Sequence, residues 1–381
     1  MTTTINNEHK KLNVPNLRFP EFQGEWEKCI LGDITENFNL RNKDKIQYPM
    51  FSVTNDRGFV PQSEQFEGRD MVGEDIKAYK IIHTNDFAYN PARINVGSIA
   101  MYTGEKPCMI SSLYVCFKTT KEVNNEWLMQ LLKTPKMNYY YNVNGEGGVR
   151  VYLFYPNFAR IRMSIPKIEE QKKIAKLLNL IDERIATQNK IIDKLQSLIK
   201  GISNRIFASI QGIEYRMGDI VTITNGNSNV QDAVTQSKDG LYPFFDRSED
   251  IKYLPTFLFD KEAIIYPGEG TEFMPRYFKG KFALHQRCYA IFEFNEIINA
   301  RFLYFYLKTR NSYFVKNAVG STVPSLRLDT FQKLKVIIPS TKTQHSVSLC
   351  LSSMEQKCNV EKKILHKLLK QKQYLLRQMF I

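Results

Sequence analysis

Two long stretches of the chain repeat apolar residues in alternating steps of four and three, which is the spacing of a coiled-coil strand. The first stretch follows Pro166 and the second follows Pro339, and neither contains a further proline. Each pattern predicts one long helix, the first over 168–207. A long helix with one apolar stripe needs a partner, so we expect the two helices to pack against each other. The expected seam comprises Ile174, Leu178, Ile181, Ile185, Ile192, Leu195 and Ile199, together with Val347, Leu351, Met354, Leu365, Leu368 and Leu375.

Polar residues interrupt both seams. Gln188 in the first seam aligns with Glu361 in the second. Lys372 breaks the second seam, and there we expect either looser packing of the helices or a contact with a partner.

Short motifs that return in the same order indicate that the sequence occurs twice. The segment Leu31–Ile34 returns as Met217–Ile220, and Glu74–Lys77 returns as Glu249–Lys252. Each copy ends with Ile-Pro directly before its long helix. We therefore predict two diverged copies of a globular domain followed by a helix, with boundaries at 1–165, 166–210, 211–338 and 339–381.

The globular parts combine short β-like runs with one or two helices each. The runs 110–117 and 288–294 favour strands, and 125–133 and 300–310 favour helices. Turn-forming residues separate these elements. The predicted fold class is α+β, with two such domains in tandem repeat.

Charge and composition narrow the classes of protein. A hydrophobic content of 43% indicates a globular chain, and the absence of a run of eighteen apolar residues argues against a membrane span. The first eleven residues are polar, so we expect a cytoplasmic protein without membrane partners. The six cysteines form no CxxC pair, which favours buried free thiols in a reducing compartment.

The basic residues concentrate on the long helices. The segment 167–208 has 9 basic and 5 acidic residues, and 340–381 has 8 basic and 2 acidic, within a net charge of +14. Such a surface is either a solvated helix face or one that lies along a phosphate backbone.

Catalytic motifs do not stand out in the sequence. It has no P-loop and no GxGxxG that opens a βαβ unit, and the five histidines lack metal-ligand spacing. Asp75-Ile76-Lys77 and Asp250-Ile251-Lys252 match the second half of the PD-(D/E)xK nuclease pattern, but neither follows a Pro-Asp pair. The duplication explains why both copies occur. We expect no catalytic residue, no metal site and no cofactor in this chain.

Several turn-rich segments instead offer groups that suit DNA. Arg pairs bidentately with guanine, Asn pairs with adenine, and Lys suits phosphates. The segments 144–150 and 320–327 occupy equivalent places before the last strand of each copy. The candidate DNA-binding residues are Asn90, Arg93, Asn95, Lys106, Arg150, Asn225, Asn227, Arg276, Lys279, Lys281, Ser321, Thr322 and Arg327.

Four features together resemble the specificity subunit of type I restriction-modification systems. They are Val14–Phe22 (VPNLRFPEF), the Gly-Asp-Ile opening of each copy, Gly320–Pro324 (GSTVP), and the Ile-Pro that precedes each long helix. The resemblance covers essentially the whole chain. It implies two target-recognition domains separated by two long antiparallel coiled-coil helices, with each domain reading one half of a gapped site in double-stranded DNA.

The resemblance also implies the partners. Two modification (methyltransferase) subunits would dock on the helices and methylate adenine with S-adenosylmethionine, and restriction (translocase and nuclease) subunits would cleave DNA with ATP and Mg. The chain itself would then be a non-catalytic recognition subunit. Two other interpretations stay open: a stand-alone metal-dependent DNA endonuclease, and a coiled-coil scaffold that binds only proteins.

Overall fold

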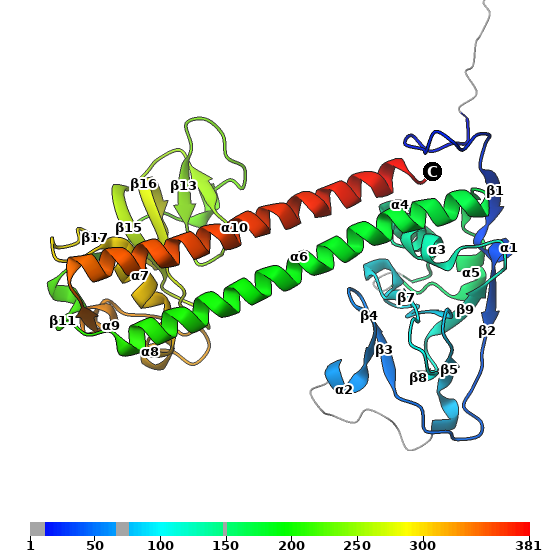
Figure 1. Cartoon of the computed structure of the whole chain (residues 1–381), viewed down its shortest axis with the longest axis horizontal. Coiled ribbons are helices and arrows are strands. Elements are labelled where there is room, and N and C mark those ends of the chain that lie inside the picture. Colours follow the sequence, from blue (N-terminus) through cyan, green and yellow to red (C-terminus); the bar gives the residue numbers. More distant parts are fainter. Residues whose placement is uncertain (1–11, 66–75, 148–150) are drawn as a thin grey trace, which may run out of the picture. The chain divides into compact units, whose positions relative to one another are not determined.

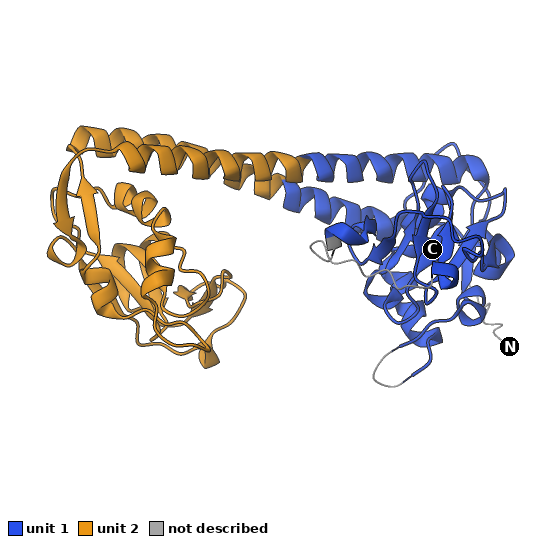
Figure 2. Cartoon of the chain, turned by 90° about the horizontal axis from the view of Figure 1, so that it is seen from below, with its two compact units in different colours: residues 1–187, 365–381 blue, residues 188–364 orange. Residues whose placement is uncertain are grey.

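The structure is a computed structural model and describes residues 12–65, 76–147 and 151–381. The chain forms two compact units, residues 1–187 with 365–381 and residues 188–364, called here the first and second unit (Figure 2). Both units contain part of each long helix. The boundaries between the compact units therefore lie within the long helices and not at the ends of the predicted domains. In the described part of the chain no helix is long and apolar enough to cross a membrane.

The first unit joins small sheets to short helices (Figure 1). Its described strands pair as β1-β10, β2-β9-β6-β7, β3-β4 and β5-β8. The core gathers Trp26, Trp127 and Phe158 around both long helices. The elements are β1 (Glu27–Ile30), α1 (Leu31–Ile34), β2 (Thr35–Phe38), β3 (Phe51–Thr54), β4 (Gly58–Pro61), α2 (Gln62–Gln65), η1 (Ile76–Ala78), β5 (Lys80–Ile82), β6 (Phe87–Tyr89), η2 (Ile94–Val96), β7 (Ile99–Met101), β8 (Cys108–Ile110), β9 (Val115–Thr119), α3 (Asn125–Leu132), α4 (Pro135–Asn144), α5 (Tyr155–Ala159), β10 (Arg162–Ile165) and the beginning of α6 (Ile168–Ser209).

The second unit is built on a six-stranded sheet in the order β12-β17-β15-β16-β13-β14, in which only β13 and β16 run parallel. Aromatic and aliphatic side chains fill both faces of this sheet. The elements are β11 (Ile213–Arg216), η3 (Met217–Asp219), β12 (Thr222–Asn225), η4 (Val230–Asp232), β13 (Tyr242–Phe245), β14 (Lys252–Leu254), β15 (Phe259–Pro267), β16 (Arg276–Leu284), β17 (Cys288–Phe292), α7 (Ala300–Lys308), α8 (Asn311–Asn317), α9 (Leu328–Gln332), β18 (Lys335–Ile338) and most of α10 (Thr341–Gln378).

The two units repeat the same frame, as the internal repeat predicts. In each copy the first strand pairs antiparallel with the last, so that Glu27 faces Ile165 and Ile213 faces Ile338. This pairing closes each globular part directly before its long helix. The sheet pairings β2-β9-β6-β7 and β12-β17-β15-β16 also correspond in order.

A buried glutamine fastens the beginning of α6 to the first globular part. Gln171 is 1% exposed, and its Nε2 donates to the carbonyls of Pro166 (2.9 Å) and Glu122 (3.1 Å). Its Oε1 accepts a hydrogen bond from the backbone N–H of Asn124 (2.8 Å). The Asn124 side chain in turn caps α3 by accepting from Trp127 N.

The second copy contains the same arrangement. Gln344 is also 1% exposed, and its Nε2 donates to the carbonyls of Pro339 (3.0 Å) and Ile297 (2.8 Å). Its Oε1 accepts from the backbone N–H of Asn299 (2.8 Å), whose side chain caps α7 through Phe302 N. A long helix is thus fastened to the cap of a short helix in each copy.

The long helices run antiparallel to each other. In the first unit the beginning of α6 packs with the end of α10, as the cluster that contains Leu178 and Leu375 shows. In the second unit the end of α6 packs with the beginning of α10, around Phe207 and Leu351. The predicted seam residues Ile174, Leu178, Ile181, Ile192, Leu351, Leu368 and Leu375 are buried, and Ile185, Leu195, Ile199, Val347, Met354 and Leu365 are half-buried.

The polar residues of the seams contact each other across the helices. Gln188 Nε2 donates to Glu361 Oε2 (2.6 Å) and to the Glu361 carbonyl (3.2 Å). Lys372 Nζ donates to Asp182 Oδ1 at 2.5 Å. The residue that breaks the second seam is therefore paired within the chain.

Glu170 in the first turn of α6 anchors the N-terminal segment. Both of its carboxylate oxygens accept from Arg18, at 2.8 Å from Nε and 2.7 Å from Nη2, and Trp26 Nε1 also donates to it (3.3 Å). Arg18 lies in the VPNLRFPEF motif, so this bidentate pair explains why an arginine occurs there.

Two expectations are wrong in detail. The run 110–117 is not one strand, because β8 ends at Ile110 and β9 begins at Val115 with a turn between them. Cys350 is exposed and Cys29 is half-buried, so only four of the six free thiols are buried.

Candidate nucleic-acid interface

An open recess of about 540 Å³ lies in the first unit, where the β3–β4 turn meets the loop after β6. The turn contributes Asn55, Asp56 and Arg57, and the loop contributes Asn90 and Arg93. The Arg93 side chain is exposed. This recess is polar and presents guanidinium and amide groups, which are the groups that read base edges.

The predicted residues of the first unit have different surroundings. Asn90 Oδ1 accepts from Ala92 N (3.0 Å) and shapes the loop that carries Arg93. Asn95 Nδ2 donates to Asn142 Oδ1 (3.0 Å) beside a neighbouring recess of about 500 Å³. Lys106 is exposed but lines neither recess, and Arg150 lies outside the described residues.

The second unit has a recess of about 510 Å³ at a comparable place. Arg247 follows β13, Glu269 lies in the loop after β15, and His285, Gln286 and Arg287 form the turn between β16 and β17. Arg247, Gln286 and Arg287 are exposed. Several hydrogen-bond donors and two carboxylates, those of Asp246 and Glu269, therefore converge here from separate turns.

Backbone hydrogen bonds fix these turns to one another. His285 N donates to Phe245 O (2.9 Å), and Gln286 N donates to Ser228 O (3.1 Å). Ser228 N donates to Leu284 O (3.1 Å). The loop after β12 is thus hydrogen-bonded to the β16–β17 turn, which lines the recess.

Two predicted asparagines lie beside this turn, Asn225 at the end of β12 and Asn227 in the loop after it. Asn225 Nδ2 donates to the Gln286 carbonyl (3.3 Å), and Asn227 Oδ1 accepts from Ser228 Oγ (3.2 Å). Both side chains are exposed, and neither lines the recess itself.

Arg276 supports the recess rather than presenting a free guanidinium. Its Nη1 donates to the Ser248 carbonyl at 2.9 Å, its Nη2 donates to the Asp246 carbonyl, and its guanidinium lies over the Phe245 ring (5.1 Å). Burial lowers the pKa of Arg276. In this structure Arg276 therefore holds the loop after β13.

The remaining predicted residues are exposed. Lys279 and Lys281 lie on β16 outside the recess, and the Lys281 ammonium lies over the Phe257 ring. Ser321 and Thr322 lie in the loop before α9, and Arg327 directly precedes the first residue of α9.

The loop before the last strand has the same frame in both copies. Glu146 and Tyr152 exchange two backbone hydrogen bonds of 2.8 Å, and Val319 and Ser325 exchange two of 2.9 and 2.8 Å. Gly147 and Gly320, at the start of the two loops, have φ of +108° and +101°. Because L-residues rarely adopt such angles, glycine is required at this point.

These loops dock against the loops that carry the recess residues. Leu153 N donates to Pro91 O (3.0 Å) in the first unit, and Leu326 N donates to Gly268 O (2.8 Å) in the second. The equivalent placement that the sequence indicates is therefore present, although the side chains differ.

Burial and hydrogen bonds shift the pKa values of two residues in the second recess, His285 and Asp246. The pKa of His285 is lowered, mainly because burial disfavours the charged imidazole. Its Nδ1 accepts from Arg287 N (3.2 Å), so neutral His285 presents Nε2–H as a donor. Burial acts to raise the pKa of Asp246, but hydrogen bonds from Lys252 and Ser248 outweigh it and lower that pKa.

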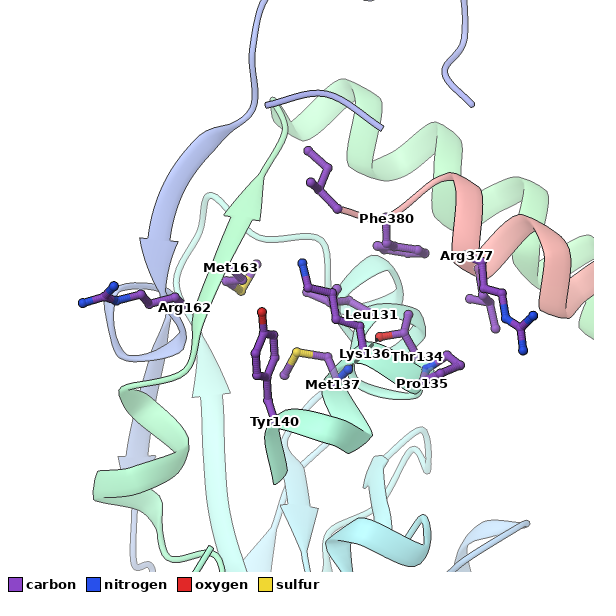
Figure 3. Close-up of a pocket in the computed structure, with 12 residues that line it drawn as sticks. Leu131, Thr134, Pro135, Lys136, Met137, Tyr140, Arg162, Met163, Arg377 and Phe380 are labelled. Carbon is purple, nitrogen blue, oxygen red and sulfur yellow. Dashed lines mark hydrogen bonds between the residues drawn. The ribbon is translucent and has the colours of Figure 1, made fainter. Parts of the chain in front are cut away.

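An apolar slot of about 140 Å³ lies elsewhere in the first unit. Figure 3 shows Phe380, just after the end of α10, above Leu131, while Arg162 and Arg377 extend away from the slot. Its apolar lining does not suit a nucleic acid.

The segments that match part of the nuclease pattern do not form a metal cluster among the described residues. Asp75 lies outside them, and Lys77 belongs to η1. Lys252 forms an ion pair with the buried Asp246 at 2.5 Å. The second lysine therefore has a structural role.

The sequence matches the family profile described as the type I restriction modification DNA specificity domain, over residues 23–197 and 213–370. The chain belongs to this family. The two matches make the specificity domains a tandem pair, in agreement with the repeat.

Known relatives share part of the sequence. The chain is 29% identical over 138 residues to the specificity subunit of the type I restriction enzyme EcoDI of Escherichia coli, covering 36% of this chain and 30% of that protein. It is 25% identical over 209 residues to the putative MjaX specificity subunit of Methanocaldococcus jannaschii, covering 52% of this chain and 49% of that protein. The matches thus span between about a third and a half of these relatives.

Solved structures share the fold of the specificity domains. The crystal structure of a type I restriction-modification S subunit from M. genitalium superposes with a TM-score of 0.65 at 16% identity, covering 97% of this chain and 99% of that one. A chain from a study of type I R-M complex assembly and conformational transition gives 0.56 at 12% identity, covering 93% of this chain and 97% of that one.

Sequence reasoning missed several residues of the specificity-domain recesses. They are Asn55 and Arg57 in the first, and Arg247, Gln286 and Arg287 in the second. Each lies in a turn directly after a strand, and that position was the available signal.

Proposed function

We propose that this chain is the non-catalytic DNA-recognition subunit of a type I restriction-modification complex, and that each unit reads one half of a bipartite site in double-stranded DNA. One observation carries the proposal. The same loop frame occurs in both units, and each frame surrounds a polar recess that carries its own set of hydrogen-bonding side chains. Membership of the family supports the proposal.

The first recess offers Arg57, Arg93 and Asn55 for base edges, and the second offers Arg247, Gln286 and Arg287. These side chains belong to the classes that pair with guanine and adenine in the major groove. Different sets in the two recesses predict two different half-sites. The exposed lysines of the predicted set suit phosphate contacts, which add affinity but no sequence information.

In this proposal the chemistry belongs to partners. Two modification subunits would dock on α6 and α10 and methylate adenine with S-adenosylmethionine, and restriction subunits would cleave DNA with ATP and Mg in the cytoplasm. The two helices would set the separation of the half-sites. This chain would bind none of these cofactors itself.

A map of N6-methyladenine tests the proposal. The chain is assembled with its modification subunits, and methylated positions are mapped with and without it by single-molecule sequencing. We expect one gapped motif, methylated on opposite strands in its two halves. Assembly of the complex without any selected motif would refute DNA recognition and favour a protein-only scaffold.

Variants then assign the half-sites. Arg93→Ala should relax selection in one half and Arg247→Ala in the other, each by roughly 1–3 kcal/mol of discrimination. Arg160→Ala and Arg216→Ala are matched controls, because both arginines are exposed and lie outside the recesses. Equal weakening of both halves by either recess variant would contradict the model of two separate readers.

A further inference from the structure

We propose that Arg287, oriented by Glu269, reads a guanine in the half-site that the second unit contacts. The inference rests on the proposed function and names one base that this recess selects. Arg287 is the reading residue, and Glu269 is a positioning residue that acts through it.

The side chains of Arg287 and Glu269 differ in solvent exposure. Arg287 Nη1 donates to Glu269 Oε1 at 2.7 Å, and the side chains are 63% and 16% exposed, respectively. The carboxylate therefore belongs to the wall of the recess, while the guanidinium projects from it. A guanidinium has five N–H donors, so the contact with Glu269 leaves donors for a base.

Both backbones are held in place. Glu269 forms a bridge with Ser325, and the neighbouring Gly270 N donates to Pro324 O (3.0 Å). Arg287 N donates to His285 Nδ1 (3.2 Å) in the turn between β16 and β17. An arginine fixed at its backbone and at one end of its guanidinium loses little freedom when it binds, which favours a contact of defined geometry.

The chemistry favours a base over a phosphate. The ion pair is neutral as a whole, and the Glu269 carboxylate repels a phosphate, so the pair is a poor general anchor for the DNA backbone. Guanine presents two acceptors, O6 and N7, that match two parallel N–H donors, whereas adenine presents one acceptor and one donor. By contrast Arg247, in the same recess, has no ion pair in the described part of the chain.

The experiment uses the full chain assembled with its modification subunits, and duplexes that carry the mapped motif. Each guanine in the half-site that Arg247→Ala affects is replaced in turn by 7-deazaguanine, which lacks the N7 acceptor. We expect one such replacement to weaken binding by the wild type by about 5- to 150-fold. The same replacement should have no effect on Arg287→Ala.

Two further variants separate base reading from other roles. Arg287→Lys should recover only part of the selection for that guanine, because an ammonium can donate to O6 and N7 but lacks the planar fork that Glu269 orients, whereas at a phosphate it can replace arginine fully. Glu269→Ala should lose selection for that guanine, and Glu269→Gln should retain it, because its amide oxygen can still accept from Arg287. Glu272→Ala is the matched control, since Glu272 is exposed in the same loop.

The outcomes are distinct. If the wild type selects a motif but the effect of 7-deazaguanine persists in Arg287→Ala, or if Arg287→Lys restores wild-type selection, the inference is overturned and the proposed function stands. If the assembled wild type selects no motif, the proposed function itself fails. Loss of selection in Glu269→Ala with full rescue by Glu269→Gln supports the positioning role.

Discussion

The buried glutamine at the beginning of each long helix should be among the most sensitive positions of the chain. Gln344→Ala removes three hydrogen bonds, to Pro339 O, Ile297 O and Asn299 N, from a site that is 1% exposed. At about 1 kcal/mol for each bond, the expected loss of stability in the second unit is about 3 kcal/mol. Gln171→Ala should cost a similar amount in the first unit, where it removes the equivalent three bonds.

Hydrogen exchange is the suitable assay, because a chain of two units need not unfold in a single step. The amide of Asn299 should lose protection in Gln344→Ala, and the amide of Asn124 should lose it in Gln171→Ala. A loss of about 3 kcal/mol corresponds to an exchange rate that is roughly 100-fold higher if exchange proceeds through local opening.

Gln373→Ala and Gln196→Ala are matched controls, because these glutamines are exposed on the same two helices. Each should change protection by less than about 0.5 kcal/mol. If Gln344→Ala and Gln373→Ala had equal effects, the fastening role of the buried glutamine would be refuted. A loss of protection at Asn124 in Gln344→Ala would show that the effect is not local.

Three further predictions concern stability. Lys372→Ala should cost no more than about 1 kcal/mol by urea unfolding, since its pair with Asp182 is partly exposed, and a cost of several kcal/mol would contradict this. The pKa of Asp246 is lower in the folded protein than in the unfolded chain, so its pair with Lys252 should stabilise the second unit above about pH 4 and lose this effect in acid. In Asp246→Asn the stability of the second unit should therefore fall less as the pH is lowered, which thermal unfolding at several pH values would show. Gly320→Ala should destabilise its loop by about 1–2 kcal/mol because φ is +101°, and unchanged exchange at the Ser325 amide would contradict the strain.

The sequence contains strong local signals for the long helices and for the repeat. The helix predicted over 168–207 is α6, Ile168–Ser209, because an apolar period sustained from Ile174 to Ile199, about seven turns, cannot arise from a short element. The duplication follows from comparing the sequence with itself. The sequence also places Gln171 and Gln344 at equivalent positions in the two copies, each five residues after the proline of the Ile-Pro pair.

The recesses could be predicted only in part, because each is assembled from turns that are far apart in the sequence. Arg93 was found because it lies in a conspicuous turn-rich segment, whereas Arg287 becomes a candidate only when Glu269 is seen beside it. Arg276 is the opposite case, a residue that the sequence suggests for DNA binding but that has a structural role. Its sequence context resembles that of a reading residue, but its guanidinium donates to two backbone carbonyls of its own unit.

The structure separates the residues that hold the frame from those that line the recesses. Substitutions of exposed residues such as Arg93 or Arg247 should change stability by less than about 0.5 kcal/mol, whereas loss of Gln171 or Gln344 should cost several times more. Side chains in the recesses can therefore be substituted without loss of the buried contacts that hold each copy together. This accounts for two copies that share their buried contacts but differ in their recesses. Arg276 does not follow this separation, and its replacement should impair both the loop and the recess that the loop supports.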